Sequence, residues 1–379
     1  MRMGQEQERV DACDVVVVGA GLTGAAVAAR LVREGFDTAV LEAQTTAGGA
    51  TGRSAGMVLT GLAGHYNWAV ATYGRQKAQN IWALTTEGRE RLVETAGQLG
   101  IPVEQTGSLA LAVDDAEVEA LEESASLLQE DGFNVQFSPN DPLERDFRAA
   151  IQCPDDVVVD ANALTWALLD TSNLAVHEGT EVHDLEPDKN GVRVWAHSRT
   201  VLCNTVVLAV NGYAPLLDSY FTDKVIPTRA LIVATEPLDK TVLEQPCYAD
   251  YGYEYCRQLP DRRLLMGSWR RPHHPHQKTK QDTEQGNVVD MVEEGLLRFA
   301  SRHFPSVETL DTSRRSGIMG FTPDGLPLVG RLPDLPQVYF AVGLGGRGLT
   351  WAFAIAERLV ASMQDDTDPG LGLFGQDEA

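Results

Sequence analysis

The chain has 379 residues, of which 43% are hydrophobic, and its 54 acidic and 31 basic side chains give a formal net charge of −23 at pH 7. The acidic balance excludes the basic surface that nucleic-acid binding needs, and no apolar run approaches the ~20 residues of a membrane-spanning helix. This length predicts a soluble protein with two sub-domains and a large core.

The cysteines are odd in number and form no CxxC pair: Cys13, Cys153, Cys203, Cys247 and Cys256. This pattern predicts reduced thiols in a reducing compartment and no metal site. The first residues are polar and acidic and lack the apolar core of a secretory signal, so we expect a cytoplasmic protein.

The first elements are predicted to form a β–α–β unit. An apolar strand over 14–18 runs into a glycine turn, a helix spans 22–34, and a second strand follows at 38–43. Continuous apolar strands are typical of a buried parallel sheet. The later elements are expected to be helices near 74–98, 114–131, 162–173, 287–305 and 349–363, strands at 107–113, 205–214, 226–238 and 262–269, and a hairpin over 180–197.

The glycine turn after the first strand, GAGLTG, predicts a dinucleotide site. Gly19 permits the tight turn, Gly21 lets the backbone approach a pyrophosphate, and Gly24 brings helix and strand together. The helix N-terminus then directs its free N–H groups at the phosphates. Glu42, at the end of the second strand, is placed to accept hydrogen bonds from the adenosine ribose. An acid there disfavours NADP and leaves NAD and FAD.

Two further glycine-rich segments favour FAD over NAD. ATGRSAG (50–56) follows the strand that carries the ribose acid and supplies a lining of small residues for a longer cofactor. GLGGRGLT (343–350) repeats the strand–glycine–helix arrangement near the other end of the chain. A helix that begins near Leu349 would direct its positive end at the bound group and stabilise the negative charge of a reduced flavin.

Together these segments resemble the D-amino-acid oxidase family of FAD-dependent enzymes, which includes glycine and sarcosine oxidases. DVVVVGAGLTGAAVAARL with VLEA, GATGRSAG, TPDGLPLVGR (322–331) and VYFAVGLGGRGLTWAFAIAERL occur in the family's order from Asp14 to Met363. Within the family, AVNGYAP and IPTRALIVATEPL are most similar to the gamma-glutamylputrescine oxidase branch.

The resemblance implies an α/β fold with a Rossmann-like FAD-binding domain built from separate segments, and a smaller α+β substrate domain with a mixed or antiparallel sheet. The expected segments are 12–75, 145–222 and 325–368 for the FAD-binding domain, 76–144 and 223–324 for the substrate domain, and 369–379 for a flexible acidic tail.

The motif and the resemblance together assign the cofactor contacts. Val182 is expected to meet the adenine through its backbone, and Ala209 to lie near the ribose and pyrophosphate. Neither cysteine nor histidine stands where some relatives attach FAD covalently, so we expect non-covalent FAD. The full set of expected contacts is Gly19, Ala20, Gly21, Leu22, Thr23, Gly24, Glu42, Ala43, Thr51, Gly52, Arg53, Ser54, Ala55, Gly56, Met57, Val182, Ala209, Asn211, Gly212, Gly345, Gly346, Arg347, Gly348, Leu349 and Thr350.

Met319 departs from the family pattern. Relatives that oxidise α-amino acids hold the substrate carboxylate with an arginine shortly before the TPDG turn, and Met319 fills that position. The alternative is that Arg257 or Arg347 holds the carboxylate. Tyr255 falls where glycine-oxidase-like relatives place a substrate-contacting tyrosine. These four residues are the candidates for the catalytic site.

Histidines occur at two other places of interest. RPHHPHQ (271–277) offers three imidazoles, but interleaved prolines and the lack of an acid or cysteine partner favour a solvated loop over a metal site. His65 and Tyr66 follow the first flavin loop, where one interpretation directs them at the substrate, but a surface loop is favoured.

The predicted function is the oxidation of a carbon–nitrogen bond in a small amine or an N-substituted, amino-acid-like compound. The resemblance implies that the substrate's α-hydrogen moves as hydride to flavin N5, that the imine hydrolyses, and that O2 or an electron carrier is the final acceptor. One alternative is carbon–oxygen oxidation, as in hydroxyacid and glycerophosphate dehydrogenases. Another is a flavin-binding protein without catalysis. Assembly into an oligomer stays open.

Overall fold

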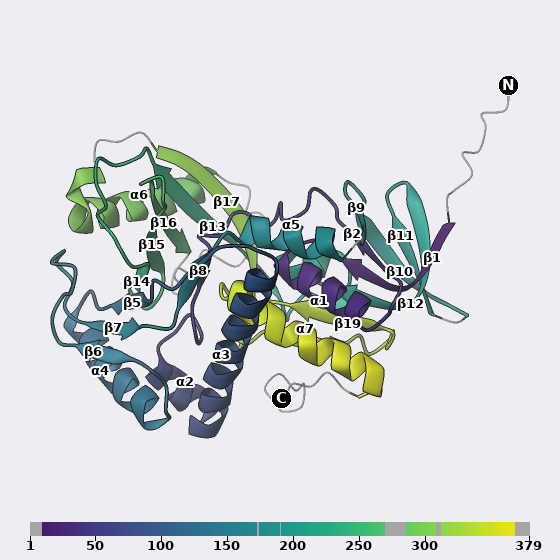
Figure 1. The fold of residues 1–379 in the computed structure, drawn as a ribbon, viewed down its shortest axis with the longest axis horizontal. Helices are drawn as coiled ribbons and strands as arrows, with labels where there is room; N and C mark the ends of the chain where they lie inside the picture. Colours follow the sequence, from purple (N-terminus) through teal and green to yellow (C-terminus); the bar gives the residue numbers. More distant parts are fainter. Residues whose placement is uncertain (1–9, 173, 190, 270–285, 308–311, 368–379) are drawn as a thin grey trace.

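The computed structural model describes residues 10–172, 174–189, 191–269, 286–307 and 312–367. Two large sheets lie toward opposite ends of the long axis, with a small three-stranded sheet as a third (Figure 1). The histidine-rich segment 271–277 and the expected tail 369–379 lie outside the described residues. No helix in the described part of the chain is long and apolar enough to cross a bilayer.

The first sheet carries the glycine turn. Parallel pairing joins β1 to β2 and β12, β2 to β9, and β12 to β19, whereas β10 and β11 form an antiparallel hairpin. In sheet order its strands are β10 (Val182–Asp188), β11 (Gly191–Ala196), β12 (Arg199–Leu208), β1 (Val10–Val18), β2 (Thr38–Leu41) and β9 (Ala175–His177), with β19 (Val338–Val342) beside β12 and β18 (Leu328–Arg331) beside β19.

Both faces of this sheet are buried, which explains its run of valines. Val15 and Val17 of β1 pack toward the helices, and Val16 and Val18 face an opposite core that includes Phe221. The helices on the first face are α1 (Leu22–Arg33), α5 (Ala161–Thr171) and α7 (Gly348–Asp365), and the short helices η1 (Asn211–Leu216) and η2 (Ser219–Phe221) adjoin the second core.

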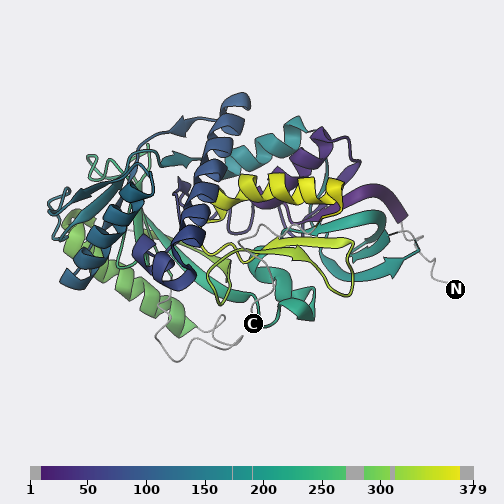
Figure 2. The same cartoon turned by 90° about the horizontal axis from the view of Figure 1, so that it is seen from below.

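The second sheet is mostly antiparallel, and its two faces are covered by different helices (Figures 1 and 2). In sheet order its strands are β17 (Thr312–Phe321), β13 (Ile226–Thr235), β16 (Leu264–Trp269), β15 (Glu254–Gln258), β14 (Cys247–Ala249), β5 (Ser108–Leu111), β7 (Ala150–Cys153) and β6 (Gln136–Ser138). The covering helices are α6 (Gly286–His303), followed by η4 (Pro305–Val307), and α4 (Asp115–Glu130).

Helix α3 (Arg75–Gln98) connects the two halves. A Cβ on Gly88 would lie 2.0 Å from the backbone oxygen of Thr350, so only glycine lets α3 pack this closely on α7. Helix α2 (Tyr66–Tyr73) precedes it, and the small sheet of β3 (Met57–Val58), β8 (Val157–Val159) and β4 (Val103–Glu104) lies nearby.

The expected α/β fold with a second, largely antiparallel sheet is confirmed, but several boundaries differ. β12 ends at Leu208 rather than 214, because Asn211 adopts φ +46 and the chain turns into η1. β13 ends at Thr235, before Pro237. An expected boundary at 145 would assign β7 to the FAD-binding part, whereas β7 pairs with β5 and β6 in the second sheet.

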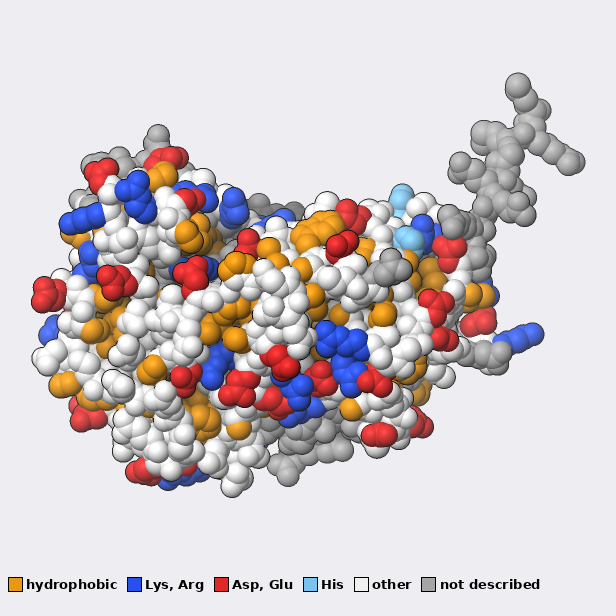
Figure 3. Space-filling model, in the orientation of Figure 1, with side chains coloured by type: hydrophobic (Ala, Val, Ile, Leu, Met, Phe, Trp, Pro, Cys, Tyr) orange, Lys and Arg blue, Asp and Glu red, His pale blue; other side chains and the backbone are white. Residues whose placement is uncertain are grey.

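Charged side chains of both signs are interspersed over the face shown in Figure 3. All five cysteines are free. Of the described residues, no group could hold a metal ion.

Candidate active site

The glycine turn fits a dinucleotide because its three glycines meet different surroundings. Gly19 has φ +105, and a Cβ there would lie 2.8 Å from the oxygen of Ala209. A Cβ on Gly24 would lie 1.9 Å from the oxygen of Gly19. A Cβ on Gly21 would meet only Thr51 Oγ1, at 3.2 Å. Gly19 and Gly24 are therefore required by the turn itself, whereas Gly21 keeps open the space before helix α1.

Glu42 lies where the ribose of a dinucleotide is expected. Its Oε2 accepts a hydrogen bond from the N–H of Ala20 at 2.8 Å, and its Oε1 accepts one from the N–H of Gln44, also at 2.8 Å. The N–H of Thr180, two residues before Val182, donates to the backbone oxygen of Glu42 at 2.8 Å. Three segments that are distant in sequence thus meet at the expected adenosine end.

The loop over 50–57 is joined to the glycine turn and to the second sheet. Thr51 Oγ1 accepts from the N–H of Leu22 at 3.1 Å, which fixes the loop to the start of α1. Arg53 Nη1 donates to the backbone oxygen of Ser316 at 3.1 Å and so connects the loop to β17 of the second sheet. Ala209 lies beside Gly19 of the glycine turn.

The glycine loop before α7 closes the far end. Gly345 and Gly346 have φ +58 and +78, and α7 begins at Gly348 without a side-chain cap from Arg347. The N–H of Thr350 already donates to the oxygen of Arg347 at 3.0 Å, whereas the N–H groups of Gly348 and Leu349 precede the first intrahelical acceptor and are available to a bound group. Leu349 lines the cavity next to the loop.

Several expected contacts support the loops instead of facing the cavity. Thr350 is fully buried and donates from Oγ1 to the oxygen of Leu59 at 2.9 Å. Asn211 Oδ1 accepts from the N–H of Leu344 at 3.1 Å, and Gly212 packs on the backbone of Met319. The sequence motifs predicted cofactor contacts at these positions and did not indicate these supporting roles.

A cavity of about 890 Å³, including its open mouth, lies between these loops and the second sheet. Of the expected residues, those that line it are Arg53, Ser54, Ala55, Met57, Tyr255, Met319, Gly346, Arg347 and Leu349. Those that the sequence did not indicate are Ala50, Leu59, Ala63, Ala230, Ile232, Tyr248, Gly252, Arg315 and Gly317. The sequence signal that could have identified several of them is the alternation of side chains between the two faces of β13 and β17, because residues two apart lie on the same face of a strand.

Tyr255 and Tyr248 are neighbours on the sheet above the cavity. The two residues pair directly across β14 and β15, and the Tyr255 ring occupies the space over Gly267, where a Cβ would lie 2.0 Å from its Cζ. Burial raises the pKa of both phenols well above their usual range. Both are therefore neutral hydrogen-bonding groups at physiological pH.

The candidate arginines have different surroundings. Arg347 is buried, with its guanidinium carbon 5.0 Å from the centroid of the Tyr248 ring. Arg257 does not line the cavity. Its Nη1 donates to the oxygen of Ala55 at 2.7 Å, and burial lowers its pKa. Met319 faces the cavity, and its Sδ would lie 4.0 Å from a Cβ on Gly346.

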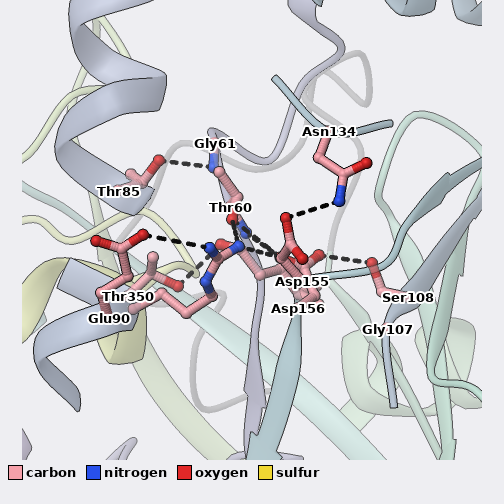
Figure 4. Close-up of polar contacts among 12 residues, drawn as sticks. Thr60, Gly61, Thr85, Glu90, Gly107, Ser108, Asn134, Asp155, Asp156 and Thr350 are labelled. Carbon is pink, nitrogen blue, oxygen red and sulfur yellow. Dashed lines mark hydrogen bonds and ion pairs between the residues drawn. The ribbon is translucent and has the colours of Figure 1, made fainter. Parts of the chain in front are cut away.

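A buried polar network supports the cavity from behind (Figure 4). Asp156 accepts from the N–H and Oγ1 of Thr60, each at 2.9 Å, and from Ser108 Oγ at 2.6 Å. Burial raises the pKa of Asp156. Because Thr60 belongs to the loop after β3 and Ser108 to β5, the network joins the second sheet to the cavity wall.

His65 and Tyr66 are buried, so the expectation of a surface loop was wrong. His65 Nε2 lies 3.1 Å from Oε1 of Glu117 on α4, and Tyr66 donates to Asp131 at 2.6 Å. These polar side chains can be buried because each has a hydrogen-bond partner on α4 or at its C-terminal end, far away in the sequence.

The comparisons with known proteins agree with this geometry. Residues 14–362 match the family model DAO, described as FAD dependent oxidoreductase. The chain is 26% identical to a gamma-glutamylputrescine oxidoreductase of Escherichia coli, covering 93% of this chain and 83% of that protein. It is 26% identical to a glycine oxidase of Geobacillus kaustophilus, with 87% of each covered.

Solved structures show the same fold. The crystal structure of glycine oxidase from Geobacillus kaustophilus superposes with a TM-score of 0.77 at 23% identity, covering 97% of this chain and 99% of that one. An L-proline dehydrogenase from P. horikoshii has a TM-score of 0.76 at 20% identity, with 95% of each chain covered. With the family model matching from the first strand into the last helix, the chain belongs to the DAO family and is an FAD-dependent oxidoreductase.

Proposed function

We propose that this oxidoreductase oxidises a carbon–nitrogen bond of a small amine. The observation that carries the proposal is the cavity wall opposite the glycine loops, where two neutral tyrosines and Met319 face the cavity. Relatives support it, since they include the oxidoreductase for gamma-glutamylputrescine, glycine oxidases, and a 4-methylaminobutanoate oxidase of Paenarthrobacter nicotinovorans that is 24% identical over 91% of this chain.

The chain's own residues bind and orient the amine. FAD, when bound without a covalent link by the glycine turns and Glu42, supplies the hydride acceptor. Tyr248 and Tyr255 can hydrogen-bond a polar group of the substrate, and Met57 and Leu59 contribute apolar surface. Of the described residues that line the cavity, none is acidic or a histidine, so the substrate must arrive as the neutral amine. The free cysteines suit a cytoplasmic setting.

Met319 is the residue from which we infer which amines the enzyme prefers. Its thioether offers only weak polar contact, so an α-carboxylate beside it would be buried without a partner. We infer that amines without an α-carboxylate are preferred over glycine-like substrates.

The test is an anaerobic screen in which amines, each paired with its α-carboxylated counterpart, are scored for bleaching of the flavin band and for kcat/KM. The wild type should favour the member without the carboxylate. Met319→Arg should shift the ratio toward glycine or sarcosine, while the volume-conserving Met319→Leu should not.

Three outcomes would contradict parts of this proposal. A wild type that favours the α-carboxylate would favour Arg347 over Arg257 as the carboxylate ligand, because Arg347 lines the cavity and Arg257 does not. Bleaching by hydroxyacids and not amines would show carbon–oxygen oxidation. Bleaching by neither class would indicate a flavin-binding protein without catalytic activity. Release of H2O2 on turnover identifies O2 as the acceptor.

A further inference from the structure

The charges around the cavity are of one sign. Three arginines line it, Arg53, Arg315 and Arg347, and none of the other lining residues that the structure describes is charged. The chain as a whole carries a net charge of −23, so this cavity is a positive site in an acidic protein. Such a cavity selects for an anionic group on its ligand.

Two of the three arginines already interact with other residues of the protein. Arg53 donates to the backbone oxygen of Ser316 and packs across Gly317, where a Cβ would lie 3.4 Å from its Cδ. Arg347 is buried and stacks on the Tyr248 ring. Arg315 is exposed and forms no ion pair with any residue that the structure describes. Its guanidinium is therefore the cation available to a ligand.

Strand alternation places Arg315 on the cavity side. Arg315, Gly317 and Met319 lie two apart on β17 and all line the cavity. Arg314 points to the other face, where its Nε lies 2.8 Å from Oε1 of Glu293 on α6. Four residues of an extended strand span about 13 Å, so Arg315 lies well away from the position that Met319 occupies.

We propose that Arg315 forms an anion subsite at the mouth of the cavity, and that the substrates are amines with a carboxylate at the end remote from the reacting nitrogen. This rests on the proposed amine oxidation. The planar guanidinium fork matches a carboxylate in two hydrogen bonds, which Met319 at the inner end cannot offer. The cavity thereby rejects an α-carboxylate and accepts a distant one.

The experiment compares ω-amino carboxylates of increasing chain length with their primary carboxamides, which have the same shape without the charge. In the wild type, kcat/KM should favour the carboxylate over the amide, most strongly at one chain length. Arg315→Gln should raise KM about five- to tenfold more for the carboxylates than for the amides, the size of one charge-assisted contact near the surface. Arg314→Gln, the matched neighbour that faces α6, should leave this ratio unchanged.

A binding measurement separates this subsite from the oxidation itself. Linear alkyl carboxylates without an amine should perturb the flavin spectrum of the holoenzyme, and Arg315→Gln should weaken their binding while Arg314→Gln does not. If no amine is oxidised but these carboxylates still depend on Arg315, the proposed function fails and the subsite stands. Equal kcat/KM for carboxylates and amides in the wild type, or equal effects of the two substitutions, would overturn the subsite.

Discussion

At the scale of single residues, the structure separates the glycines of the first turn that the fold requires from the one that it does not. Gly19 and Gly24 would place a Cβ within 2.8 and 1.9 Å of backbone oxygen atoms, so the protein cannot fold its turn around any other residue. Gly21 has only the side-chain hydroxyl of Thr51 nearby, at 3.2 Å. The fold therefore does not require a glycine at this position, and we expect its lack of a side chain to serve the cofactor.

Gly21→Val should leave the chain folded but prevent flavin binding. A valine displaces only the Thr51 hydroxyl in the protein itself, yet it fills the space that the pyrophosphate needs. Flavin occupancy comes from the ratio of visible to ultraviolet absorbance, and folding from circular dichroism. Gly24→Ala should damage folding, and Gly97→Ala on α3, where a Cβ meets nothing within 4 Å, should affect neither. Full flavin occupancy in Gly21→Val would place the phosphate site elsewhere.

Local motifs could be predicted from the sequence, and residues that depend on strand register could not. The glycine turn and Glu42 follow from a motif within one β–α–β unit. Tyr248 and Arg315 line the cavity only because β14 and β17 present one face to it, and that face depends on pairing with strands far away in sequence. Met319 was identified through its place before a turn, which is again a local signal.

At the scale of elements, β15 of the second sheet holds a loop of the first half in place. Arg257 near the end of β15 donates to the backbone oxygen of Ala55 at 2.7 Å, and a Cβ on Gly56 would lie 2.6 Å from its Nη1. The loop over 50–57 is thus shaped by a side chain about 200 residues later in the chain. The sequence offered this arginine only as an alternative ligand, beside Arg347, for the substrate carboxylate.

Arg257→Met should weaken FAD binding and leave substrate discrimination intact. The Ala55 carbonyl would lose its partner at a cost of about 1–3 kcal/mol, which corresponds to roughly 5- to 150-fold in FAD dissociation constant if the loop must be reordered. Fluorescence titration of apoprotein with FAD measures this effect. Arg263→Met, which removes a partly exposed arginine paired with Asp261, is the control. An intact FAD affinity with a raised KM for carboxylated substrates would restore Arg257 as a carboxylate ligand.

The element boundaries that differ from expectation also depend on contacts with distant parts of the chain. The apolar run over 205–214 reads as one strand, but Asn211 leaves the extended region and uses its side chain to hold Leu344. The position of β7 depends on pairing with β5 and β6, which no local pattern specifies.

At the scale of the whole molecule, the cavity exists only where two sheets meet, and a few buried polar groups join them. Asp156 has hydrogen-bond donors from both sides and is satisfied. Glu254 on β15 is different. Its Oε2 is buried and has no hydrogen-bond partner in the described part of the chain, and burial together with the nearby Glu117 raises its pKa to about 7.

This pKa predicts that stability falls as the pH rises through neutrality. Glutamate in an unfolded chain has a pKa of roughly 4.3, so the folded protein holds a proton on Glu254 that the unfolded chain has lost. The stabilising contribution is complete below about pH 4.3 and is lost progressively up to about pH 7. At about 1.4 kcal/mol for each pKa unit, the loss amounts to about 4 kcal/mol. Glu254→Gln, a neutral side chain of the same shape, should match the wild-type melting temperature near pH 4 and exceed it at pH 8. Glu119→Gln on the exposed side of α4 should change neither value. A Glu254→Gln melting temperature that differs from the wild type by the same amount at both pH values would show that this carboxyl titrates normally in the fold.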